Sequence, residues 1–437
     1  MDFTRVNNEL FAFIEKSPTA CHAVRELEKM WQEAGYIPCE ETKQWELKEG
    51  GKYYVKRNDS SIIAFSLPKK GMDAMKGFHG ICTHSDSPCF KIKENAEMIL
   101  ENYTRLNTEK YGGMILSTWL DRPLSIAGRV MIEKDGKTRC RLVSIPRNLL
   151  VIPNLAIHMN RDMNKGVEYN PQVDMLPLFG TRDGKGLKSL LAEELNREAK
   201  ERDEADRVKE EDILSYDLFV YVREKGCQIG SEEEYILAPR LDDLQCVFAA
   251  GQAMVKAQAQ DYANLCIVFD NEEVGSSTAQ GADSTFLSDV VERIGSGFGK
   301  SSGWLKQMLA GSLFISADNA HALHPNHPEK ADPTNRPVLN GGPVIKYHGS
   351  QKYTTDAKTA AVMKLLCKKA GVPVQSYTNR SDVLGGSTLG NISTSHLSVP
   401  TVDVGLPQLA MHSAVETAGA KDTAYLVAVF EEFYKGE

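Results

Sequence analysis

Five apolar, strand-like runs in this chain of 437 residues end directly in side chains that can bind a metal ion. The runs are GICTHSDSP, ILAPRLDDL, LCIVFDNEEVGS, LFISADNAHALHPN and LPQLAMHSAVE. In open α/β sheets, ligands bind outside the carboxyl ends of the strands, so segments that are distant in sequence can converge there. The pattern therefore predicts an α/β fold with a single site, built from His84, Asp242, Glu273, Asp318 and His412.

Strands and helices are predicted to alternate near both ends of the chain but not in its middle. Two amphipathic helices at 3–15 and 22–34 precede the predicted strands KYYVKR, SIIAFSL and GFHGICTH, and the alternation returns after Leu237. The stretch between carries strand-like pieces such as RVMIE and DLFVYV among long polar connections. We expect a three-layer α/β/α catalytic domain formed by 1–91 and 236–437, interrupted by an inserted β-rich domain at 92–235.

The donor set contains two imidazoles and three carboxylates, which suits zinc, with cobalt and manganese as alternatives. Two ions would need a carboxylate shared between them. We expect Asp242 to be this bridge, with His84 and Asp318 completing the shell of one ion and Glu273 and His412 that of the other.

Glu272 lies next to the predicted ligand Glu273, and adjacent carboxylates in a loop can point in different directions. Glu272 can then take a proton from an attacking water and pass it to a leaving amine. Each of the five segments alone has an ordinary explanation, such as a turn with a capping Asp or a solvated loop. Their coincidence favours metal-assisted hydrolysis.

Composition and charge exclude several other classes of protein. The formal net charge is -8, which opposes approach to phosphate backbones and anionic membranes, so no nucleic-acid or membrane partner is expected. No stretch approaches the roughly 20 apolar residues of a membrane span, and the N-terminus lacks the pattern of a signal peptide. Nine cysteines without a C-x-x-C pair are typical of reduced thiols, so a cytoplasmic location is expected.

The motifs, taken in order, resemble the M18 family of metallopeptidases, the aspartyl aminopeptidase group. The resemblance runs nearly from end to end and is carried by SPTACHAV, CTHSDSPC, APRLDDL, DNEEVGS, SADNAHALHPN, KYHGSQKYTT, GGSTLG and AMHSAVE. It implies a dinuclear zinc aminopeptidase that removes an N-terminal residue, Asp or Glu or a neutral one, from short peptides. It also implies dimers that assemble into a dodecamer.

The resemblance implies roles for individual residues. The five predicted metal ligands match the ligands of the family, and Glu272 matches its catalytic carboxylate. Asp86 matches a carboxylate that orients a ligand histidine, and His158 matches a histidine that reaches the site of a neighbouring subunit. The positions that match the substrate pocket are Lys346, Tyr353, Gly385 and Gly386.

Two other functions stay open on the sequence. One is a metal-dependent deacylase or amidohydrolase that acts on small N-acyl compounds. The other is a non-catalytic scaffold, which the presence of Glu272 disfavours because a scaffold has no use for a proton carrier.

Overall fold

The structure is a computed structural model that describes residues 1–201, 207–383, 389–393 and 396–436. Its contacts divide the chain into two compact units. The first comprises Met1–Asp86, Gly226–Met411 and Glu416–Glu437, and the second comprises Ser87–Lys225 and His412–Val415. The two ends of the chain thus share one unit, with the middle in the other.

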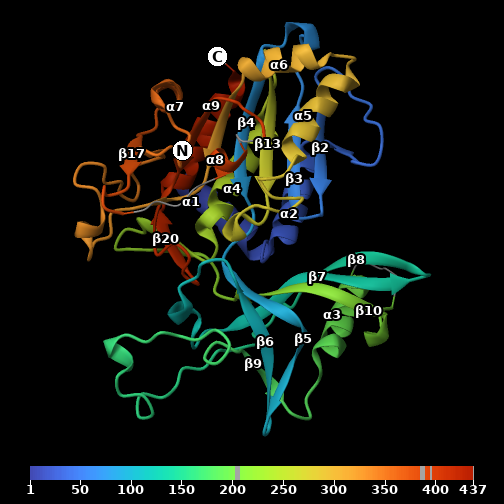
Figure 1. The fold of residues 1–437 in the computed structure, drawn as a ribbon, viewed down its shortest axis with the longest axis vertical. Coiled ribbons are helices and arrows are strands. Elements are labelled where there is room, and N and C mark those ends of the chain that lie inside the picture. Colours follow the sequence, from blue (N-terminus) through green and yellow to red (C-terminus); the bar gives the residue numbers. More distant parts are fainter. Residues whose placement is uncertain (202–206, 384–388, 394–395, 437) are drawn as a thin grey trace. The chain divides into compact units, whose positions relative to one another are not determined.

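A nine-stranded sheet forms the centre of the first unit. Its strand order is β1 (Ile37–Cys39), β2 (Lys52–Arg57), β3 (Ser61–Ser66), β13 (Tyr262–Phe269), β4 (Gly77–His84), β14 (Leu313–Ala317), β18 (Thr401–Gly405), β16 (Val344–Tyr347) and β17 (Gln375–Thr378). Strands β2, β3, β13 and β4 run side by side in Figure 1. The four neighbours β13, β4, β14 and β18 are parallel, so their carboxyl ends lie at one edge of the sheet.

Helices cover both faces of this sheet. In β3, Ile62 and Ala64 share a core with one group of helices, whereas Ile63 and Phe65 share a core with another, as the alternation of side chains along a strand requires. The first group is α1 (Phe3–Lys16), α2 (Ala20–Glu33), α4 (Leu241–Lys256), α7 (Ala357–Ala370) and α9 (Asp422–Lys435), and the second is α5 (Phe286–Gly297), α6 (Ser302–Ala310) and the short α8 (Leu389–Ser393). The predicted three-layer α/β/α fold is confirmed.

A smaller five-stranded sheet in the same unit gathers segments from distant parts of the chain. Its order is β11 (Cys227–Ile229), β12 (Tyr235–Ala238), β20 (Glu416–Gly419), β19 (Pro407–Leu409) and β15 (Ala320–His321). Strand β12 leads into α4, and β15 follows β14 after two residues. The small sheet therefore links the segment before Asp242 to the segment after Asp318.

The second unit is built on a six-stranded sheet with its own hydrophobic core. The order is β8 (Lys137–Ser144), β7 (Leu124–Lys134), β10 (Ile213–Val222), β5 (Cys89–Leu100), β6 (Tyr103–Tyr111) and β9 (Leu178–Thr181), and its neighbouring strands are antiparallel. Helix α3 (Leu187–Glu201) buries Leu191 and Leu195 in this core. The inserted β-rich part expected from the sequence is present, and the exact domain boundaries stay a prediction.

Candidate metal centre

Three parallel strands carry most of the predicted site residues to the same edge of the large sheet. His84 is the last residue of β4 and pairs with Phe269, the last residue of β13. Glu272 and Glu273 follow β13 in a single 3-10 turn, and Asp318 directly follows β14. Because Ser316 pairs with Cys82, the register brings Asp318 level with His84.

The side chains from these strand ends meet around His84, which is 1% exposed. Its Nε2 atom lies 3.6 Å from Oδ1 of Asp242 and 3.8 Å from Oδ1 of Asp318. Ligand atoms of these three residues lie within 4.8 Å of one another, and so do those of His84, Glu272 and Glu273. Asp242 arrives from the first turn of α4, a helix that packs against β4 and β13.

The electrostatics of this cluster favour a bound cation. Burial raises the pKa of Glu272 to about 7, and the charges of Asp318, Asp86 and Asp242 add to the rise while His84 opposes it. Burial lowers the pKa of His84, but the carboxylates around it outweigh this effect and raise that pKa well above its usual value. Buried carboxylates at this density need a positive charge between them.

The donor types and spacing also fit zinc. Tetrahedral ligands about 2.0–2.1 Å from a zinc ion lie about 3.4 Å apart, close to the separations of the His84 nitrogen from the two aspartate oxygens. Imidazole and carboxylate are the donors that zinc, cobalt and manganese accept. The residues present therefore fit the group that the sequence predicts.

Asp86 links the histidine to the turn that carries the two glutamates. Its buried carboxylate lies 3.4 Å from Nδ1 of His84 and accepts hydrogen bonds from the backbone N–H groups of Glu272 and Glu273, each at 3.1 Å. The Nδ1 atom also lies 3.1 Å from the backbone oxygen of Asp86. Asp86 thus contacts the ring of one predicted ligand and the backbone of another.

His412 belongs to the short segment that groups with the second unit. Within that unit its Nδ1 atom lies 2.7 Å from the carbonyl oxygen of Gly113, which can only accept, so Nδ1 donates this hydrogen bond. Metal-binding histidines commonly have this arrangement. His158 lies in an exposed turn of the second unit. The roles of both histidines stay predictions.

Lys346, expected in a substrate pocket, is 2% exposed and contacts a predicted metal ligand. Its Nζ atom donates to Oδ2 of Asp318 and to the backbone oxygen of Asn319, both at 3.1 Å. Nζ also lies 5.5 Å from the ring centroid of Tyr353. Burial lowers the pKa of Lys346, but the negative charge of Asp318 outweighs it and the net pKa is raised. Gly385 and Gly386 lie outside the described residues.

The sequence did not single out three buried polar residues that surround the aspartates. They are Asn319, Gln408 and Glu416. Glu416 ends the AMHSAVE motif, so its motif was visible but its role was not. Asn319 and Gln408 likewise lie in the quoted runs SADNAHALHPN and LPQLAMHSAVE, but nothing in those runs distinguishes them from ordinary polar residues.

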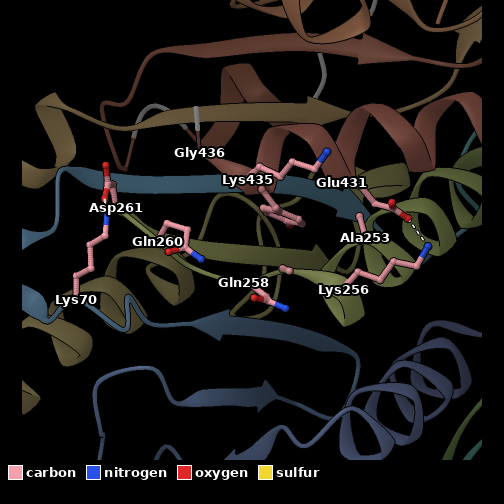
Figure 2. Close-up of a pocket in the computed structure, with 11 residues that line it drawn as sticks. Lys70, Ala253, Lys256, Gln258, Gln260, Asp261, Glu431, Lys435 and Gly436 are labelled. Carbon is pink, nitrogen blue, oxygen red and sulfur yellow. Dashed lines mark hydrogen bonds and ion pairs between the residues drawn. The ribbon is translucent and has the colours of Figure 1, made fainter. Parts of the chain in front are cut away.

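A cavity of about 630 Å³ lies elsewhere in the first unit and is shown in Figure 2. It is lined by polar and charged side chains that form ordinary ion pairs, such as Lys256 with Glu431 at 2.5 Å. Among the described residues that line it, none belongs to the predicted metal site.

A three-layer α/β/α unit whose parallel strands bring histidine and carboxylate side chains together is typical of metal-dependent hydrolases. The family model described as Aminopeptidase I zinc metalloprotease (M18) matches residues 13–434. The chain belongs to this family and is a metallo-aminopeptidase.

Individual relatives agree with this assignment. The chain is 48% identical over 436 residues to the "Probable M18 family aminopeptidase 2" of Clostridium acetobutylicum, and the match covers 98% of each chain. A protein with the same printed name from Pseudomonas savastanoi is 39% identical, again over 98% of each chain.

Solved structures share the fold. A cryo-EM structure of the Ape4 and Nbr1 complex matches with a TM-score of 0.94 and 36% identity, covering 99% of this chain and 86% of that one. The S. cerevesiae mApe1 dodecamer matches with a TM-score of 0.84 and 29% identity, covering 100% of this chain and 98% of that one. Among the helices that the structure describes, none is long and apolar enough to cross a membrane.

Proposed function

We propose that this aminopeptidase uses two divalent ions to remove the N-terminal residue of short peptides. The proposal rests above all on the convergence of His84, Asp242, Glu272, Glu273 and Asp318 at one edge of the sheet. His84 and Asp318 would complete the shell of one ion and Glu273 and His412 that of the other, with Asp242 shared. Zinc is the proposed metal, with cobalt and manganese as alternatives.

The ions would polarise the scissile carbonyl and lower the pKa of the attacking water. Glu272 is proposed to accept the proton of that water and then to deliver it to the leaving amine. Burial favours the neutral form of Glu272, whereas nearby cations would favour its carboxylate, so the side chain can both accept and release a proton. Asp86 would keep Glu272 and Glu273 in place through their backbone N–H groups.

The preferred N-terminal residue is proposed to be Asp or Glu, with neutral residues as the alternative. The support is the buried ammonium of Lys346 beside Tyr353, which could pair with a substrate carboxylate. This ammonium already contacts Asp318, so acidic substrates must share it. Gly385 and Gly386 are proposed to complete the pocket.

We further propose that the chain assembles through dimers into a dodecamer and acts in the cytoplasm. Support for assembly comes from the likeness to the mApe1 dodecamer and from exposed apolar side chains around His158, namely Leu155, Ile157 and Met159. Exposed apolar groups that cluster in this way are typical of interfaces. His158 would then act in the site of a neighbouring subunit. The cytoplasmic location is supported by nine free cysteines.

The Glu272→Gln variant tests the proton carrier. Glutamine keeps the size of the side chain but cannot carry a proton, so kcat should fall by roughly 100-fold or more while zinc content stays unchanged. Glu292→Gln is a matched control, because it makes the same chemical change on the exposed side of α5. A Glu272→Gln enzyme with a normal rate would remove Glu272 from the mechanism.

Substrate panels test the reaction itself. Aspartyl, glutamyl, alanyl and leucyl substrates would be assayed with free and with acetylated amino groups, in the presence of zinc, cobalt or manganese. We expect cleavage of the free-amine substrates alone. Cleavage restricted to acetylated substrates would favour a deacylase and contradict the proposal.

A further inference from the structure

Three buried polar side chains form a chain of hydrogen bonds beside the proposed metal ligands. Glu416, 2% exposed, accepts a hydrogen bond from the backbone N–H of Asp242 at 3.0 Å. The side-chain amide of Gln408 donates to the other oxygen of Glu416 at 3.5 Å and accepts from Nδ2 of Asn319 at 2.8 Å. Asn319 directly follows Asp318, so the chain runs from one proposed ligand to another.

Asn319 and Glu416 bind both polar groups of the peptide unit that joins Leu241 to Asp242. Nδ2 of Asn319 donates to the carbonyl oxygen of Leu241 at 3.1 Å, while Glu416 accepts from the N–H of Asp242. The carbonyl and the N–H belong to one planar group. With both ends bonded, this peptide unit cannot rotate without breaking a buried hydrogen bond.

The backbone at this point needs such support. Asp242 has φ −82° and ψ 109°, which are not helical values although α4 begins at Leu241. The first N–H groups of a helix have no partner within the helix. Glu416 supplies the acceptor.

The small sheet explains how residues so distant in sequence meet. Glu416 of β20 pairs with Ala238 of β12, four residues before Asp242. Gln408 of β19 pairs with Ala418 of β20, and β19 also pairs with β15, which starts directly after Asn319. The sheet thus fixes the three side chains relative to the backbone of both aspartates.

We propose that Glu416, acting through Gln408 and Asn319, is a positioning residue that sets the separation of Asp242 and Asp318 for metal binding. The inference rests on the proposed function, because it takes both aspartates as metal ligands. Glu416 itself does not bind the metal in this scheme. Its effect is to prevent the shared ligand Asp242 from turning away from His84.

The test measures the zinc affinity of the purified full-length chain by competition with a chelator. Replacing outer partners of metal ligands typically costs roughly 10- to 100-fold in affinity, and we expect Glu416→Ala to weaken zinc binding by that factor. Glu416→Gln retains an oxygen that can accept from Asp242, but its amide nitrogen faces the donor of Gln408, so it should recover only part of the loss. Gln408→Leu removes the hydrogen bonds to Glu416 and Asn319 and should also weaken zinc binding. This variant replaces Glu416→Ala in the test if Glu416→Ala fails to fold.

Asn7→Ala is the matched control for a merely structural role. The buried Asn7 side chain donates to the carbonyl oxygen of Ala420, next to the end of β20, at 2.9 Å. Both alanine variants should lower the unfolding temperature of the metal-free protein, but only Glu416→Ala should lose zinc affinity. Equal affinities for Glu416→Ala and wild type, or equal losses for Glu416→Ala and Asn7→Ala, would overturn the inference.

A variant of a proposed ligand separates this inference from the proposed function. His84→Ala removes a proposed ligand and should abolish binding of one zinc ion. Normal zinc binding by His84→Ala would show that the metal site itself is wrongly assigned. Loss of binding in His84→Ala together with normal binding in Glu416→Ala would overturn the positioning role alone.

Discussion

The Lys346→Met substitution should destabilise the metal-free protein far more than an ordinary loss of a lysine. Nζ of Lys346 lies 3.1 Å from Asp318, whose side chain is 15% exposed. Opposite charges at such a distance attract by about 5 kcal/mol at an effective dielectric constant of about 20. Removing one partner of a buried pair costs about 3–5 kcal/mol, and the partial exposure of Asp318 favours the lower end, about 3 kcal/mol.

Thermal unfolding in the presence of a chelator measures this cost. For a large unit, 1 kcal/mol corresponds to about 2 °C, so the unfolding temperature should fall by about 6 °C. Zinc should reduce the difference, because a bound cation neutralises Asp318 in place of the ammonium.

Lys256→Met is the control for this measurement. Lys256 is 60% exposed and pairs with Glu431 in Figure 2, and an exposed pair of this kind contributes at most about 1 kcal/mol. Similar shifts for the two variants would refute the reasoning, because they would show that burial does not strengthen the Lys346 pair.

Two further predictions concern residues away from the strand ends. His158→Ala should lower kcat without changing zinc content or the mass of the assembly, and an unchanged rate would make His158 structural. His79 stacks between Tyr262 and Phe433, and burial lowers its pKa to about 4. The unfolded chain takes up this proton at a higher pH than the folded protein. The contribution of His79 to the free energy of unfolding is therefore complete above about pH 6.5 and is lost as the pH falls towards 4. The loss amounts to about 2 kcal/mol at pH 5. Between pH 7.5 and pH 5 the unfolding temperature should therefore fall further for the wild type than for His79→Phe. Equal falls would show that protonation of His79 does not cause the loss of stability.

Much of the fold could be predicted because its signals are local. The strand that became β4 was visible as GFHGICTH, and the helices predicted at 3–15 and 22–34 correspond to the observed α1 and α2. Helices α5 and α6 were not predicted. Helix α6 has only nine residues and a weak apolar periodicity, whereas the apolar residues of α5 recur at helical spacing and offered a usable signal.

The candidate site could also be predicted only in part. The donor residues were visible because each follows an apolar run, and the parallel arrangement of strands then brings His84, Glu273 and Asp318 together. Lys346 is predicted to line the substrate pocket, and only the fold showed that it also donates to Asp318. No local pattern distinguishes a lysine that pairs with a ligand from one that lines a pocket.

The amino-acid sequence by itself determined which chemical groups are available and at which strand ends they occur, because these properties depend on neighbours along the chain. Only the tertiary structure decided that Glu416 reaches the N–H of Asp242 and that Asn319 reaches the carbonyl of Leu241. These contacts join residues 174 and 78 positions apart. Their formation depends on the register of two sheets, which arises only when the whole unit packs.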